Sequence, residues 1–173
     1  EDAELIKGFV DDIDIHSITA SQVFGVPLSE VTKELRSKAK AVNFGIVYGI
    51  SEYGLAKNIN STRPDAAKYM RNYLAHYSGV DSYMKHVIEE AKEKGVVKTI
   101  FGRMRTVPEL KSANYLTRNF GERIAMNMPI QGTAADIMKL AMIKVYNKLK
   151  EKKLTAKLIM QVHDELIIEA PPS

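Results

Sequence analysis

Apolar side chains recur every three or four positions along most of this sequence, which is the spacing of helices with one buried face. Helices are predicted up to Gly25, from Thr32 to about Tyr48, from Thr62 to Tyr77 and from Asp81 to Lys94. Thr32 and Thr62 are good N-cap residues, and Gly25, Gly49 and Gly95 stand where helices commonly end. The first half of the chain is therefore expected to be helical.

Two breaks interrupt this helical pattern. The tripeptide SGV at 78–80 separates two of the predicted helices. Pro129 lacks a backbone N–H, so the helix that begins near Ser112 is expected to end or kink there. Thr133 followed by Asp136 resembles a capping box, which predicts the start of a further helix.

Strand patterns replace the helical spacing in two places. VVKTIFGRMRTVPEL, at 96–110, has β-branched residues on both sides of Phe101-Gly102 and predicts a small hairpin. LTAKLIMQVHDELIIEAP, at 154–171, predicts two apolar strands around a tight turn at His163-Asp164. The predicted fold class is α+β and mainly helical, with the β structure confined to these hairpins.

The amino-acid composition excludes some kinds of protein and of binding site. The 173 residues include no cysteine, which excludes disulfides and thiolate metal sites. No apolar run approaches the roughly 18 residues that cross a bilayer, so no membrane contact is expected. A net charge of +4 favours a polyanionic partner, but a slightly basic cytosolic domain without such a partner is equally compatible with it.

Four residues of RSKAKAVNFGIVYG, at 36–49, follow a strict spacing of four: Arg36, Lys40, Phe44 and Tyr48. On a helix they form one slowly turning line about 18 Å long, which we call the α-helical stripe. Its cations lie at the helix N-terminus, where the helix dipole is already positive and favours an anion. A nucleoside triphosphate would suit this order, with phosphates beside the cations and the base near Tyr48. An ordinary amphipathic helix whose aromatic residues face a core is the alternative.

Two polar patterns near the end of the chain carry further candidates. His163, Asp164 and Glu165 form a predicted hairpin tip that could present a carboxylate to a divalent ion, although a plain polar turn has the same composition. Arg123, Asn127 and Gln131 offer donors at a spacing of four, which could contact acceptors in the DNA minor groove or form a side-chain network.

Arginines at the first hairpin and an acidic segment near the N-terminus are less specific. Arg103 and Arg105 beside the turn are compatible with contact to a phosphate backbone, as they are with simple solvation. The DIDIH segment alternates acidic residues before His16, but it lacks the glycine and glutamate of a calcium-binding loop.

Taken together, these segments resemble the family A DNA polymerases of bacteria over essentially the whole chain. RSKAKAVNFGIVYG is similar to motif B on the fingers helix of that family, and QVHDE at 161–165 is similar to motif C in the palm. RIAMNMPIQGTAAD at 123–136 and DIDIHSITASQVFGV at 12–26 resemble two further segments, in the same order. The resemblance implies fingers helices plus part of an antiparallel palm sheet.

The resemblance also implies a division of roles among the residues. The implied activity is template-directed nucleotidyl transfer from deoxynucleoside triphosphates to a primer 3′-hydroxyl, in DNA replication and repair. It would use two Mg²⁺ ions. The implied catalytic residues are Asp164, which would be a metal ligand, and Glu165, His163 and Lys40. The implied nucleotide-binding residues are His16, Arg36, Lys40, Phe44 and Tyr48. The implied DNA-binding residues are Arg123, Asn127, Gln131, Arg103 and Arg105. The implied partner is primer-template DNA, for a monomeric enzyme in the bacterial cytoplasm at the nucleoid.

One part of the family's pattern is missing from the sequence. Motif A, DYSQIELR, carries the other catalytic aspartate and is expected just before residue 1, so the chain resembles a fragment that is inactive alone. We expect a palm-proximal segment at 1–13, fingers at 14–120 and partial palm at 121–173. Two alternatives stay open: a non-catalytic nucleic-acid-binding module, and a fragment of a single-subunit RNA polymerase, whose corresponding helix lacks the aromatic residue at Phe44.

Overall fold

The computed structural model describes residues 2–172, which form two compact units. The first unit contains residues up to 97 together with 105–127, and the second contains 98–104 and the chain from 128 onward. The predicted subdomain boundaries after residues 13 and 120 stay predictions, and their outer bounds, Glu1 and Ser173, lie outside the described residues.

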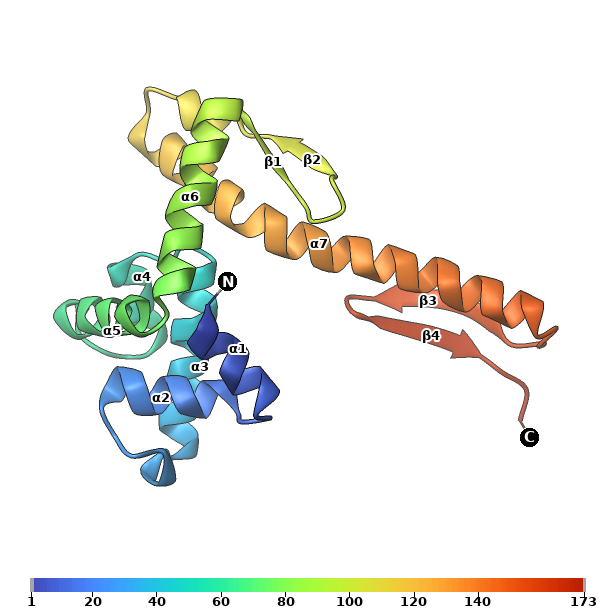
Figure 1. Ribbon diagram of the computed structural model, residues 1–173, viewed down its shortest axis with the longest axis horizontal. Coiled ribbons are helices and arrows are strands. Elements are labelled where there is room, and N and C mark those ends of the chain that lie inside the picture. The colour runs from blue at the N-terminus through green and yellow to red at the C-terminus, as the bar shows by residue number, and fades with distance from the viewer. Residues whose placement is uncertain (1, 173) are drawn as a thin grey trace. The chain divides into compact units, whose positions relative to one another are not determined.

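The first unit is helical. Its elements are α1 (Ala3–Val10), α2 (Ile15–Phe24), the 3-10 helix η1 (Leu28–Glu30), α3 (Lys33–Val47), α4 (Glu52–Asn58), α5 (Arg63–His76), α6 (Ser78–Lys94), the 3-10 helix η2 (Pro108–Lys111) and the first part of α7 (Tyr115–Glu151) (Figure 1). Thr32 and Thr62 accept hydrogen bonds from backbone N–H groups three residues on, which confirms both predicted N-caps. Gly25 and Gly95 end α2 and α6 in the left-handed conformation, as predicted.

The core of this unit lies where α2 packs on α3 and α5. Its buried side chains are Val23, Val42, Ile46, Leu55, Ala56, Ile59, Ala66, Tyr73 and Tyr77. Burial of apolar side chains is the main source of stability for such a helical cluster. Because α3 contributes one face to this core, its opposite face is left at the surface.

The predicted β structure is confirmed as two separate hairpins. β1 (Val96–Lys98) pairs with β2 (Met104–Thr106), and β3 (Lys157–Val162) pairs antiparallel with β4 (Glu165–Glu169). Val162 is opposite Glu165, so two residues, His163 and Asp164, form the second turn. Within the part of the chain that the structure describes, no helix is both long and apolar enough to cross a bilayer.

Two predicted breaks in the helices are wrong. Ser78-Gly79-Val80 lies inside α6, and the interruption is at Tyr77. Pro129 does not end a helix either, since it lies inside α7, which is 37 residues long; the alternative of a kink at Pro129 stays a prediction. In the second unit the Thr133 hydroxyl donates to the Pro129 carbonyl and also accepts from the Ile100 N–H. Thr133 is therefore not an N-cap; it ties the helix near the proline to the first hairpin loop.

Candidate functional site

The α-helical stripe lies on the solvent-facing side of α3. Phe44 and Tyr48 are 44% and 41% exposed, although large aromatic side chains are usually much more buried. The opposite face supplies the buried residues of the helix: Ala39, Val42, Asn43, Gly45 and Ile46. This arrangement confirms the prediction of a free stripe and contradicts the alternative in which Phe44 and Tyr48 face the core.

Side chains along the stripe contact one another in sequence. The Lys40 Nζ lies 5.9 Å from the centroid of the Phe44 ring, within cation–π range. The Phe44 and Tyr48 rings are stacked, with centroids 6.0 Å apart and planes inclined by 25°. His16 of α2 joins them, its ring centroid 5.8 Å from that of Phe44. Cationic groups and aromatic faces thus form one continuous surface.

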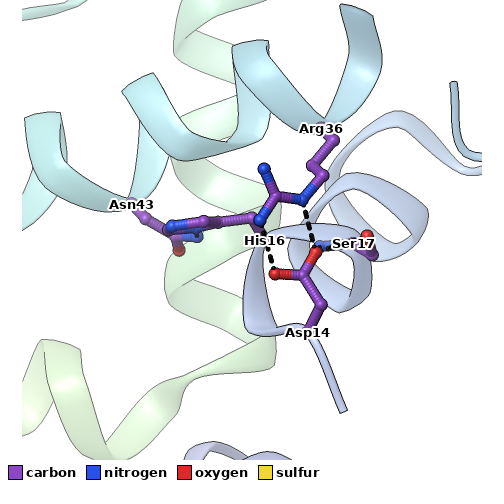
Figure 2. Close-up of polar contacts among 5 residues, drawn as sticks. All are labelled: Asp14, His16, Ser17, Arg36 and Asn43. Atoms are coloured by element: carbon purple, nitrogen blue, oxygen red, sulfur yellow. Dashed lines mark hydrogen bonds and ion pairs between the residues drawn. The ribbon is translucent and has the colours of Figure 1, made fainter. Parts of the chain in front are cut away.

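Asp14 binds the first residue of the stripe in the first unit (Figure 2). Arg36 donates from Nε to Asp14 Oδ2 over 2.7 Å and from Nη2 to Oδ1 over 2.9 Å. Asp14 also caps α2, since its carboxylate accepts from the backbone N–H and the hydroxyl of Ser17. The hydrogen bonds from Arg36, and then from Ser17, hold the pKa of the Asp14 carboxyl well below its usual value.

His16 is held by a buried polar network behind the stripe (Figure 2). Asn43 Nδ2 lies 2.9 Å from His16 Nδ1, and Asn43 Oδ1 accepts from the Thr19 hydroxyl at 3.1 Å. The Thr19 hydroxyl is also 3.3 Å from that of Tyr77 in the core. An amide nitrogen only donates, so Nδ1 of His16 accepts and its ring proton is on Nε2.

Burial is the largest influence on the ionisation of His16. It lowers the pKa of the imidazole, because a partly buried cation loses hydration. The Asp14 carboxylate raises the pKa of His16, while the positive charges of Arg36 and Lys40 lower it. The net effect is a lowered pKa, so the ring is a neutral Nε2–H donor at neutral pH.

A hollow opens beside the aromatic end of the stripe, within the first unit. Its volume is about 490 Å³, and its lining includes Phe44, Tyr48, Gly49, Ile50, Ser51 and Arg123. Gly49 has φ 70°, and a Cβ at this position would come within 2.5 Å of Met126 Cε and 2.9 Å of Arg123 Cγ. A larger residue at position 49 would therefore combine a strained backbone with displacement of the Met126 and Arg123 side chains.

The predicted minor-groove residues are distributed over both units. Arg123 and Asn127 belong to the first unit and Gln131 to the second. Arg123 is exposed, with its guanidinium carbon 5.7 Å from the centroid of Phe120. Asn127 Oδ1 is buried without a hydrogen-bond partner among the described residues, and Gln131 is exposed. Their role in contacting DNA stays a prediction.

The two arginines of the first hairpin differ in their surroundings. Arg103 donates from Nε to Asp136 Oδ1 over 2.7 Å and from Nη2 to the Gly132 carbonyl over 2.8 Å, within the second unit. These contacts fasten the hairpin loop to α7, so Arg103 has a structural role that the sequence pattern did not indicate. Arg105 is exposed on β2. DNA contact by either arginine stays a prediction.

The acidic tip of the second hairpin is open to solvent. His163, Asp164 and Glu165 are all exposed, and Gln161 Nε2 donates to the His163 carbonyl over 2.9 Å. His163 has φ 51°, a left-handed conformation that is uncommon for a residue with a side chain. Among residues 2–172 no group of three or more acidic, histidine or cysteine side chains is placed to hold a metal ion. The tip therefore supplies at most part of a metal site.

Sequence reasoning missed the partners of His16 and Arg36, which are Asn43 and Asp14. In the sequence Asp14 stands out only within the acidic alternation before His16, and Asn43 only as a member of the buried face of the helix. The Asp14–Ser17 spacing is a helix-cap signal that could have indicated the role of Asp14 in α2. Nothing in the sequence indicates its pairing with Arg36, 22 positions further on.

Comparison with known proteins gives concordant matches. The sequence model of DNA polymerase family A matches residues 1–173. The chain is 56% identical to DNA polymerase I of Caldicellulosiruptor bescii, over 99% of this chain and 20% of that protein. It is 55% identical to DNA polymerase I of Bacillus subtilis, over 99% of this chain and 19% of that protein. The chain thus spans about one fifth of the length of these relatives.

A solved structure matches the fold as well. It is the POL domain of Pol1 from M. smegmatis in complex with DNA primer-template and dNTP. The TM-score is 0.91 at 44% sequence identity, over 98% of this chain and 30% of that one.

Proposed function

Because this chain belongs to the family A DNA polymerases, we propose that it supplies the nucleotide-binding helix and part of the DNA-contacting surface of a DNA-directed DNA polymerase. The observation that carries the proposal is the exposed stripe of α3, with two cationic side chains at its N-terminal end and two aromatic rings beside a hollow at the other. The solved relative with a bound dNTP and primer-template supports this assignment.

The order of the stripe suits the parts of one nucleotide. Arg36 and Lys40 bind the triphosphate by charge and hydrogen bonds, and His16 adds a neutral Nε2–H donor beside them. Phe44 packs on the sugar. Tyr48 contacts the base at the hollow, where an apolar ring face can stack on any of the four bases.

The remaining candidates are proposed to act on the DNA and at the reacting atoms. Arg123, Asn127 and Gln131 contact the primer-template minor groove, and Arg103 and Arg105 contact its backbone. Asp164 is one ligand of the Mg²⁺ ions that stabilise charge in phosphoryl transfer, with Glu165 and His163 beside it. The described residues do not complete such a metal site, so the other ligands are expected from further parts of a complete polymerase. The proposed working form is monomeric and is located with the chromosomal DNA.

The first test is a complete polymerase in which residues 1–173 replace the matching segment of the Bacillus subtilis enzyme; we call it the chimeric polymerase. It should extend a primer on a DNA template, whereas residues 1–173 alone should not. A chimeric polymerase that is folded but unable to extend a primer would count against the proposed function. Extension by residues 1–173 alone would contradict the proposed dependence on further residues.

A pair of lysine substitutions on α3 tests the role of the stripe. Lys40→Ala should raise the KM for the deoxynucleotide at least tenfold, because it removes a charge beside the triphosphate. Lys38→Ala is the matched control, since Lys38 lies on the same helix but pairs with Glu34 at 2.7 Å. Equal effects of the two substitutions would favour a nucleic-acid-binding module that responds only to total charge.

A further inference from the structure

Asp14 carries a negative charge at the end of the stripe where phosphates are proposed to bind. Its carboxylate lies 2.7 Å from Arg36 Nε, and its low pKa keeps it ionised at neutral pH. On charge alone, a carboxylate here would repel a triphosphate and weaken its binding. Electrostatic attraction of the nucleotide therefore does not explain why a carboxylate lies beside Arg36.

The contact between Asp14 and Arg36 leaves part of the guanidinium available. Arg36 uses its Nε–H and one Nη2–H for the two carboxylate oxygens. A guanidinium has five N–H groups, so two on Nη1 and one on Nη2 remain. No other described residue accepts a hydrogen bond from Arg36. Two of these three donors, one on Nη1 and one on Nη2, share the terminal edge of the guanidinium, which suits the fork-like contact of arginine with phosphate.

Asp14 is itself fixed in place. Its Oδ2 accepts from the Ser17 backbone N–H at 3.0 Å, and the Ser17 hydroxyl donates to the same oxygen. These bonds anchor the carboxylate to the first turn of α2, which is packed against α3. Both the position and the direction of its lone pairs are thus set by the fold before any ligand arrives.

We propose that Asp14 is a positioning residue that holds the Arg36 guanidinium in one orientation, with its free edge directed at the phosphates of the incoming nucleotide. The inference rests on the proposed function. A free arginine side chain loses considerable rotational entropy when it binds a ligand. With Asp14 in place that entropy is lost on folding, so nucleotide binding is stronger despite the added negative charge.

The competing explanation makes a prediction of opposite sign. If Asp14 served only to cap α2, neutralising it would remove repulsion, and the nucleotide would bind as well or more tightly. If Asp14 positions Arg36, neutralising it weakens nucleotide binding even though the site becomes more positive. The direction of the change therefore separates the two explanations.

Asp14→Asn in the chimeric polymerase is the central experiment. Asparagine is as good an N-cap as aspartate, so α2 keeps its first turn while the charged pair with Arg36 is lost. The KM for the deoxynucleotide should rise about tenfold with kcat little changed, as expected for an interaction made in both the ground and the transition state. An unchanged or lower KM would overturn the proposal.

Glu34→Gln is the matched control for charge. It also removes one negative charge close to the start of α3, but Glu34 pairs with Lys38 rather than with Arg36. This variant should leave the KM unchanged or slightly lower. A KM that rises as much in Glu34→Gln as in Asp14→Asn would show a general effect of charge and would contradict positioning.

A double substitution separates failure of the inference from failure of the proposed function. Arg36→Ala alone should raise the KM, and adding Asp14→Asn to it should not raise the KM further, because the positioned group is already absent and only the repulsion by the carboxylate is removed. If Arg36→Ala has no effect on the KM, the phosphate-binding role of Arg36 fails. If Arg36→Ala raises the KM and Asp14→Asn does not, only the inference about Asp14 fails.

Ser17→Ala tests the positioning of Asp14 without changing any charge. Ser17→Ala retains the carboxylate but removes the hydroxyl that fixes it. It should raise the KM by a smaller factor than Asp14→Asn and should have no effect when Arg36 is alanine. An effect of the same size in both backgrounds would contradict positioning through Arg36.

Discussion

Asn43 donates from Nδ2 to Nδ1 of His16 over 2.9 Å, and this contact decides which ring nitrogen carries the proton. Asn43 is only 9% exposed, and its carbonyl oxygen accepts from the Thr19 hydroxyl, so both polar groups of the amide have partners in this arrangement. The Nε2–H of His16 is consequently the donor available to a ligand. A buried residue of α3 thus sets the chemistry of a side chain on α2.

Replacing Asn43 with aspartate should reverse this arrangement. A carboxylate beside Nδ1 accepts a hydrogen bond where the amide donated one, which favours the Nδ1–H form and the charged imidazolium. The pKa of His16 should therefore rise, and its Nδ1 should become protonated. Heteronuclear NMR of the imidazole nitrogens measures both quantities, with His16→Gln used to assign the signal. An unchanged tautomer would contradict the role given to Asn43.

The lowered pKa of His16 predicts how stability depends on pH. Because the folded-state pKa lies below the usual value of 6.5, the unfolded chain binds more protons between the two values. The free energy of unfolding should therefore be fully retained above 6.5 and should decrease as pH falls below it. Urea unfolding of residues 1–173 at several pH values between 7.5 and 5 measures the trend.

His16→Gln supplies the control for this pH dependence. Glutamine cannot titrate, so the contribution of His16 disappears and the stability of the variant should fall less steeply over the same pH range. Identical slopes for the two proteins would contradict a lowered pKa at His16.

Glycine at position 49 is predicted to be indispensable for packing. Gly49→Ala adds a Cβ at φ 70° and 2.5 Å from Met126 Cε, so it combines backbone strain with a steric clash. Gly25→Ala has nearly the same φ, 71°, but nothing lies within 4 Å of the added atom. Gly25→Ala should cost about 1 kcal/mol of unfolding free energy, and Gly49→Ala at least about 1 kcal/mol more.

Urea unfolding of the two glycine variants provides the comparison. Equal losses of stability would mean that the end of α3 does not approach α7 as closely as described. The hollow beside Tyr48 should also change shape in Gly49→Ala, since Gly49 and Arg123 both line it.

Substitutions at the hairpin tip separate backbone strain from side-chain chemistry at His163. At φ 51° an alanine is strained and a glycine is not, so His163→Gly should be more stable than His163→Ala by about 1 kcal/mol. Both variants lack the imidazole, so primer extension by the chimeric polymerase should fall equally in both. If activity followed the stability of the hairpin instead, the imidazole would have no direct role.

The exposed face of α3 could be predicted because it depends on local information. The helical period places Arg36, Lys40, Phe44 and Tyr48 on one side, and small apolar residues provide a better alternative for the core. The N-caps at Thr32 and Thr62 and the helix end at Gly95 were predictable for the same reason. Caps act within one turn of the residue that makes them.

The other features depend on contacts between distant segments. Near Pro129 the helix is tied to the first hairpin loop by Thr133, which donates to the Pro129 carbonyl, and by Arg103, which donates to the Gly132 carbonyl; a rule about proline alone takes no account of such neighbours. The pairing of Asp14 with Arg36 and of Asn43 with His16 arises from the packing of α2 on α3. No spacing along the chain encodes that packing.

The small buried side chains of α3 have a consequence for the engineering of the proposed nucleotide-binding stripe. Ala39 and Val42 are fully buried, and their size sets how close α3 lies to the core and how the helix is rotated about its axis. A larger residue at either position would overpack the core, so α3 and the stripe on it would have to shift without a change in any residue of the stripe. Libraries selected for polymerases that accept modified nucleotides should therefore vary these hidden positions together with the exposed ones.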